Sequence, residues 1–175
     1  MANLWRELRP GPQVPDVVYA LVEIPKGSHV KYKFNKESGV IVEDRVLFSA
    51  LHYPGDYGLI PRTFCEDGDP LDILIMTGEP TFPGCVIQAR VIGIFRTLDG
   101  GLKDDKILAV PATDPLCSET HELIDVAPHY LREVAHFFEV YKDLEAVRTK
   151  VLGWEDAASA KAEVLKSIQR YSERF

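Results

Sequence analysis

The stretch Glu66-Asp67-Gly68-Asp69-Pro70-Leu71-Asp72-Ile73-Leu74-Ile75-Met76 holds four carboxylates within seven residues and then becomes apolar. Neighbouring carboxylates repel one another, so the arrangement is costly unless cations lie close by. The apolar part is bounded by turn residues, which predicts a buried strand from Leu71 to Met76. The stretch therefore predicts a β-rich fold that presents acidic side chains at a strand end.

Further apolar and β-branched runs lie on both sides of this strand, with turn residues between them. They predict strands at Val17 to Ile24, Val30 to Phe34, Val40 to Phe48, Cys85 to Phe95 and Lys106 to Val110. After Pro128 the apolar spacing becomes helical and continues to Leu144, and a second helix is expected from about Asp156 to Arg174. Strands followed by helices are typical of an α+β domain in which two main helices pack against a small barrel.

Length and composition indicate a single domain over residues 1–175. Acidic residues outnumber basic ones by 27 to 20, and the net charge of −7 argues against nucleic acid or an anionic membrane as a partner. Apolar runs such as Val17 to Val22 are much shorter than the roughly 20 residues that span a bilayer. Three widely spaced cysteines favour a reduced, cytoplasmic location.

Two acidic groups are candidate metal ligands. Oxygen ligands such as those of Asp67, Asp69 and Asp72 suit Mg²⁺, Mn²⁺ or Ca²⁺, although a solvated turn in which Asp69 caps local amides explains the same pattern. An EF-hand is excluded, because its loop needs Gly and Glu at positions that are occupied by Asp72 and Gly78. The second group is either a polar hairpin tip or a facing set of ligands; it comprises Asp99, Asp104 and Asp105.

Basic residues and phenols supply the complementary half of a phosphate site. Alternation puts Lys31 and Lys33 on one face of their strand, where they can meet an anion, and Arg45 interrupts an apolar run, where a charge needs a partner. Four further residues are candidates that packing or snorkelling explains equally well; they are Tyr53, Tyr57, Tyr141 and Lys142.

Taken together, these motifs resemble the soluble family I inorganic pyrophosphatases of prokaryotes. The resemblance runs in family order from about residue 18 to residue 143. The segments that carry it are Glu23-Ile24-Pro25, Lys31-Tyr32, Asp44-Arg45, Tyr53-Pro54 with Tyr57-Gly58, Asp67-Gly68-Asp69-Pro70-Leu71-Asp72, Lys103-Asp104-Asp105-Lys106, and His136-Phe137-Phe138-Glu139 with Tyr141-Lys142-Asp143.

The resemblance implies an OB-like five-stranded β-barrel and Mg²⁺-dependent hydrolysis of pyrophosphate to two orthophosphates by a metal-activated water. It implies several Mg²⁺ ions, with Mn²⁺ or Zn²⁺ as substitutes, and a homohexamer in which His136 lies at a subunit contact. It identifies the metal ligands as Asp67, Asp72, Asp99, Asp104 and Glu23. It identifies the catalytic residues as Asp69 (the base), Tyr57, Arg45 and Lys31, and the substrate-binding residues as Lys31, Arg45, Tyr57, Lys106, Tyr141 and Lys142.

Two positions depart from the family pattern. Lys33 stands where the family usually carries Glu, and Gly100 follows Asp99 where many bacterial members carry Glu. The alternative function is an OB-type module that binds divalent cations or anions without turnover. Such a decayed relative would be expected to lose some ligand, base or phosphate-binding residues, whereas all of them are present here.

Overall fold

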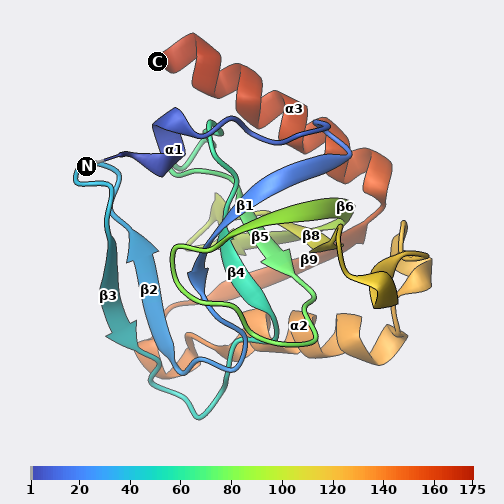
Figure 1. Ribbon diagram of the computed structural model, residues 1–175. Coiled ribbons are helices and arrows are strands. Elements are labelled where there is room, and N and C mark those ends of the chain that lie inside the picture. Colours follow the sequence, from blue (N-terminus) through green and yellow to red (C-terminus); the bar gives the residue numbers. More distant parts are fainter. Residues whose placement is uncertain (1) are drawn as a thin grey trace.

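A closed ring of five strands forms the centre of the computed structural model, which describes residues 2–175 (Figure 1). The strands of the ring, in spatial order, are β1 (Val17–Ile24), β4 (Asp56–Leu59), β5 (Asp72–Ile75), β8 (Lys106–Pro111) and β6 (Val86–Asp99). Strand β6 pairs with β1 and closes the ring. Only β5 and β8 pair in parallel among these neighbours, and their register places Asp72 opposite Lys106. This arrangement confirms the expected α+β fold with an OB-like ring of five strands.

Four strands lie outside the ring. The long strand β6 extends beyond it and pairs there with β7 (Leu102–Lys103) and β9 (Thr149–Glu155). Strands β2 (Val30–Phe34) and β3 (Ile41–Val46) form a separate antiparallel hairpin, in which Lys31 lies opposite Arg45. The hairpin therefore brings two basic side chains to one side of the ring.

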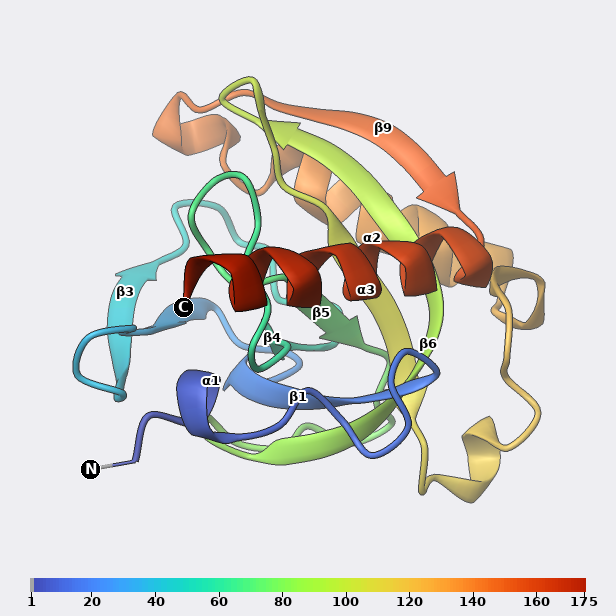
Figure 2. The same ribbon diagram turned by 90° about the horizontal axis from the view of Figure 1, so that it is seen from above.

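The two main helices that the sequence predicted lie on opposite sides of the ring (Figures 1 and 2). Helix α2 (Pro128–Val140) begins with proline, whose missing N–H costs nothing at a helix start. Helix α3 (Ala157–Arg174) begins after Asp156, whose side chain accepts a hydrogen bond from the Ser159 amide. The remaining helical segments are short: α1 (Leu4–Glu7), η1 (Pro115–Cys117), η2 (Leu123–Asp125) and η3 (Asp143–Glu145). Within residues 2–175, no helix has both the length and the apolar character needed to cross a membrane.

Two main apolar clusters hold these layers together. Aliphatic side chains from β5, β6 and β8 pack against Ala160 and Val164 of α3. On the other side, α2 packs aromatic rings against the ring of strands, and Phe137 stacks on Tyr141 with centroids 5.1 Å apart. Tyr53 and Tyr57 belong to this second cluster and are almost fully buried. Both phenols are thus held rigidly beneath the acidic strand ends.

The sequence-based boundaries differ from the structure in a few places. The sequence predicted no strand at residues 53–58, yet β4 begins there, at Asp56, and is a member of the ring. A Cβ on Gly58 would lie 2.0 Å from the Leu21 carbonyl oxygen, so glycine permits the close approach of β1 that a pattern of apolar residues does not reveal. Strand β9 was also not predicted, and α2 ends at Val140, before Leu144.

Candidate active site

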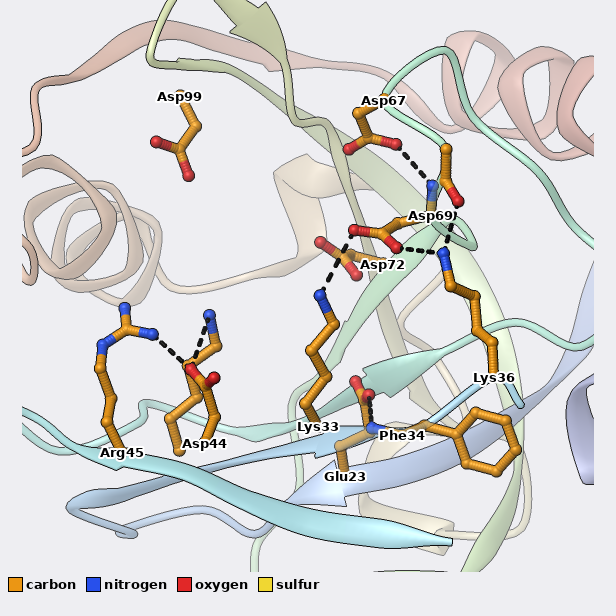
Figure 3. A network of polar contacts seen from close by, with 12 residues as sticks. Glu23, Lys33, Phe34, Lys36, Asp44, Arg45, Asp67, Asp69, Asp72 and Asp99 are labelled. Carbon is orange, nitrogen blue, oxygen red and sulfur yellow. Dashed lines mark hydrogen bonds and ion pairs between the residues drawn. The ribbon is translucent and has the colours of Figure 1, made fainter. Parts of the chain in front are cut away.

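An open cavity of about 350 Å³ lies where the acidic turn, the β2–β3 hairpin, the β6–β7 turn and the end of α2 meet. Its charged lining has two signs. The acidic lining residues are Glu23, Asp67, Asp69, Asp72, Asp99 and Asp104, and the basic ones are Lys31, Lys33, Lys36, Lys103 and Lys142. Tyr57 and Tyr141 also line it. Figure 3 shows part of this group, with carboxylates and ammonium groups pointing toward one another.

Asp72 lies at the deep side of the cavity, at the first residue of β5. The Tyr57 hydroxyl donates a hydrogen bond of 2.6 Å to its Oδ2 atom. Burial, followed by the negative charge of Asp104, raises the pKa of Asp72 well above its ordinary value of 3.8. Because the neighbouring carboxylate disfavours a second negative charge, this position favours the arrival of a cation.

Lys106 is almost fully buried and neutralises Asp104. Its Nζ atom lies 2.9 Å from Asp104 Oδ2 and 3.9 Å from Asp72 Oδ2, and it also lies over the Phe138 ring. Burial alone would raise the pKa of Asp104, but the charge and hydrogen bond of Lys106 outweigh burial and lower it. The single ammonium group of Lys106 therefore lies beside two carboxylates, those of Asp72 and Asp104. Its one positive charge does not balance two negative charges.

The acidic turn holds Asp67 and Asp69 at the cavity mouth. The backbone amide of Asp69 donates to Asp67 Oδ1 at 3.0 Å, and Gly68 between them adopts a φ of +86°. The segment is therefore a tight turn that carries both side chains. Burial raises the pKa of Asp67 above its ordinary value of 3.8. The hydrogen bond from the Asp69 amide opposes this shift, and the negative charge of Asp69 adds to it.

Glu23 reaches the cavity floor from β1. Its side chain is 8% exposed, and Oε1 accepts a hydrogen bond of 2.7 Å from the Phe34 amide. Burial raises the pKa of Glu23 to about 7, although that hydrogen bond and the charges of Lys31 and Lys33 oppose the shift. This carboxyl is thus another buried oxygen donor without a full counter-charge.

The basic side of the site lies opposite these carboxylates. Burial and the neighbouring charges of Lys142 and Arg45 lower the pKa of Lys31, so three cations are close together there. All three are paired with acids. Lys31 Nζ lies 3.9 Å from Asp44 Oδ2, Lys142 Nζ lies 2.5 Å from Asp99 Oδ2, and Arg45 Nε lies 2.6 Å from Glu145 Oε1. Arg45 also contacts Asp44. A cluster of cations held this way suits a polyanionic ligand.

The structure brings most of the predicted site residues together. Arg45 and Lys106 do not line the cavity. Lys106 contacts the lining residues Asp72 and Asp104, whereas the acids that pair with Arg45 lie outside the lining. Asp105, which we grouped with Asp99 and Asp104, points away and pairs with Arg96 at 2.8 Å. Sequence reasoning missed Lys36 and Glu145; their partners lie tens of residues away in the chain, and no local pattern indicates such contacts.

The carboxylate set is chemically suited to a hard divalent cation. Every candidate ligand is an oxygen donor, and buried carboxyls with raised pKa values lie on one side of the cavity. Within residues 2–175, no three Asp, Glu, His or Cys side chains already converge as a cation cage, and lysines occupy the positions beside Asp69, Asp99 and Asp104. The residues present therefore fit such an ion in type and charge.

Comparison with known proteins agrees with this chemistry. The sequence model of the family described as Inorganic pyrophosphatase matches residues 20–172. Similar proteins include an inorganic pyrophosphatase of Halobacterium salinarum, 47% identical over 100% of this chain and 99% of that protein, and one of Nostoc sp., 50% identical over 93% and 96%. The crystal structure of inorganic pyrophosphatase from Thermus thermophilus superposes with a TM-score of 0.95 at 42% identity, covering 98% of this chain and 99% of that one.

Proposed function

Because the chain belongs to the family I inorganic pyrophosphatases and is a hydrolase of inorganic pyrophosphate, we propose that it forms two orthophosphates by direct in-line attack of water in the cavity described above, with Mg²⁺. The observation that carries this proposal is the facing of carboxylates and cations across one cavity. Pyrophosphate repels anionic nucleophiles, so its hydrolysis needs positive charge on the phosphates and a water whose proton can be removed.

Five carboxylates would hold the metal ions: Asp67, Asp72, Asp99, Asp104 and Glu23. When bound, Mg²⁺ would supply charge neutralisation and a more acidic water. The absence of a sulfur or imidazole donor from this set favours Mg²⁺ or Mn²⁺. Zn²⁺ as a further substitute rests on the family relationship alone.

Asp69 would accept the proton of the attacking water at a carboxylate oxygen. Its Oδ1 and Oδ2 atoms face Lys36 and Lys33 at the cavity lining, where a base needs only to come within hydrogen-bond reach of that water. The phosphates would be bound by Lys31, Arg45, Lys106, Tyr141 and Lys142. Tyr57 would orient Asp72 through the hydrogen bond between them. Positive charge fixed next to the leaving phosphate stabilises the charge that develops there, and no covalent intermediate is needed.

We further propose a cytoplasmic homohexamer that uses neither nucleic acid nor membrane as a partner. The net charge of −7 and the density of carboxylates at the cavity support the exclusion of nucleic acid. The hexamer rests on the family relationship, which also supports His136 as a contact residue; that side chain is exposed on α2.

The test is phosphate release from pyrophosphate with and without Mg²⁺, with ATP as a control substrate. Wild type should release phosphate only with a divalent metal, and Asp69→Asn should lower kcat by about 100-fold or more, as expected for loss of a general base. Glu66→Gln is the matched control, because Glu66 belongs to the same turn but pairs with Arg170 and does not line the cavity. Its kcat should stay within about twofold of wild type.

Two results would contradict the proposal. Full activity in Asp69→Asn would remove the assigned base. No phosphate release at any concentration of Mg²⁺ or Mn²⁺ would favour the binding module without turnover, and the likeness to pyrophosphatases would then concern the fold alone.

A further inference from the structure

Two lysines contact the Asp69 carboxylate at different distances, as drawn in Figure 3. Lys36 Nζ lies 2.7 Å from Asp69 Oδ1, whereas Lys33 Nζ lies 3.6 Å from Oδ2. The Lys36 side chain is 34% exposed and that of Lys33 is 52% exposed. Lys36 therefore makes a hydrogen-bonded ion pair, whereas Lys33 contributes a more distant charge.

Lys36 also fixes the backbone of the acidic turn. The same ammonium group donates to the Gly68 carbonyl oxygen at 2.7 Å. Gly68 has a positive φ, and a Cβ placed on it would meet nothing within 4 Å, so the space on that side of the glycine is open. Hydrogen bonds within the turn join Cys65 to Asp69 and Gly68 to Cys65. Lys36 thus supplies a contact from a different element, 32 and 33 residues away along the chain.

The backbone that carries Lys36 is itself well anchored. Lys36 lies in the turn between β2 and β3, where the Asn35 side chain accepts hydrogen bonds from the Glu37 and Ser38 amides. The Asn3 side chain donates to the Lys36 carbonyl oxygen at 2.8 Å. Because the lysine backbone is fixed from two sides, its ammonium group can define where Asp69 lies.

We propose that Lys36 is a positioning residue for pyrophosphate hydrolysis, which orients the Asp69 carboxylate by gripping Oδ1 and the Gly68 carbonyl together. This inference rests on the proposed role of Asp69 as the base. Because Lys36 binds Oδ1, the Oδ2 atom of Asp69 is directed toward Lys33 and the cavity, where the proton is to be accepted. A displacement of about 1 Å at such a group is enough to slow a reaction by up to about 100-fold.

The test compares Lys36→Gln, Lys36→Arg and the control Lys161→Gln. Lys161 forms an ion pair with Asp16 of the same length, 2.7 Å, at nearly the same exposure (35%), and it lies on α3 away from the cavity. Lys36→Gln should lower kcat by about tenfold to 100-fold while KM changes by less than about twofold, because Lys36 positions the base and does not bind substrate. Lys36→Arg should recover most of kcat, since it keeps a donor with positive charge. Lys161→Gln should behave as wild type.

A second measurement does not depend on turnover. Hydrogen–deuterium exchange of the amides of residues 65–69, in the protein without substrate, should be faster in Lys36→Gln than in wild type or Lys161→Gln, at equal thermal unfolding midpoints. Unchanged exchange together with unchanged kcat would overturn the proposal, and so would an equal loss from Lys36→Gln and Lys36→Arg. If wild type itself released no phosphate, the proposed function would fail, and with it the catalytic role of Lys36, even if exchange confirmed that Lys36 holds the turn.

Discussion

At the scale of single residues, Lys33 is the departure from the family pattern with the largest expected effect. It places a positive charge 3.6 Å from Asp69, at the mouth of a cavity that is to bind cations. Lys33→Glu changes the local charge by two units. At a half-exposed position this is expected to tighten Mg²⁺ binding by about 1–2 kcal/mol, or roughly fivefold to 30-fold.

Calorimetric titration of the substrate-free protein with Mg²⁺ measures this change directly. Lys166→Glu is the control, because Lys166 is exposed on α3 and does not line the cavity. Its curve should match that of wild type. Identical curves for Lys33→Glu and wild type would show that Lys33 has no influence on metal binding.

At the scale of elements, an ion-pair network joins α3 to β6. Arg96 of β6 contacts Glu163 of α3 at 3.3 Å, and Arg170 contacts the other oxygen of Glu163 at 3.0 Å. Burial alone would raise the pKa of Glu163, but the hydrogen bonds and charges of Arg170 and Arg96 lower it below its ordinary value of 4.5. The network therefore stabilises the folded chain only while Glu163 is ionised.

This network predicts a pH-dependent loss of stability. Since the pKa of Glu163 is lowered by folding, its contribution is complete above the unfolded pKa of about 4.5 and is lost as pH falls through the lower folded pKa. Glu163→Gln should cost about 1–3 kcal/mol in the free energy of unfolding at pH 7, and its deficit relative to wild type should shrink below pH 4.5.

Urea denaturation at a series of pH values checks this expectation. Glu173→Gln serves as the control on the same helix. Glu173 is exposed, and its side chain accepts a hydrogen bond from Gln169 of the same helix. A deficit of Glu163→Gln that stays constant from pH 7 to pH 3 would contradict the assignment.

The elements also show how far sequence reasoning reaches. Strand β1, the hairpin strand β2 and the two long helices carry regular apolar patterns, and the sequence predicted them closely. Strands β4 and β9 each contain a glycine within the strand, Gly58 and Gly153, which breaks such a pattern. The candidate site residues followed from motifs and family resemblance, but the contacts of Lys36 with the acidic turn depend on tertiary folding.

At the scale of the whole molecule, closure of the strand ring brings the candidate site residues of separate segments to one cavity. The parallel pairing of β5 with β8 sets Asp72 beside Lys106, and the extension of β6 beyond the ring brings Asp99 to the same cavity. The hairpin β2–β3 lines one part of the same cavity with basic residues. None of these segments carries the whole site, so its assembly depends on the complete fold.

Some large apolar side chains of the molecule are exposed to solvent in the single chain. Leu116 and Ile124, in the turns between β8 and α2, are each 91% exposed, and His136 is exposed on α2. If the proposed hexamer forms, light scattering after size exclusion should give about six times the chain mass of 19.7 kDa. His136→Glu, which introduces a charge that an apolar contact disfavours, should lower that mass, whereas His52→Glu, at an exposed histidine outside α2, should not. A wild-type mass of one chain would contradict the hexamer, and an unchanged mass for His136→Glu would remove His136 from the contact.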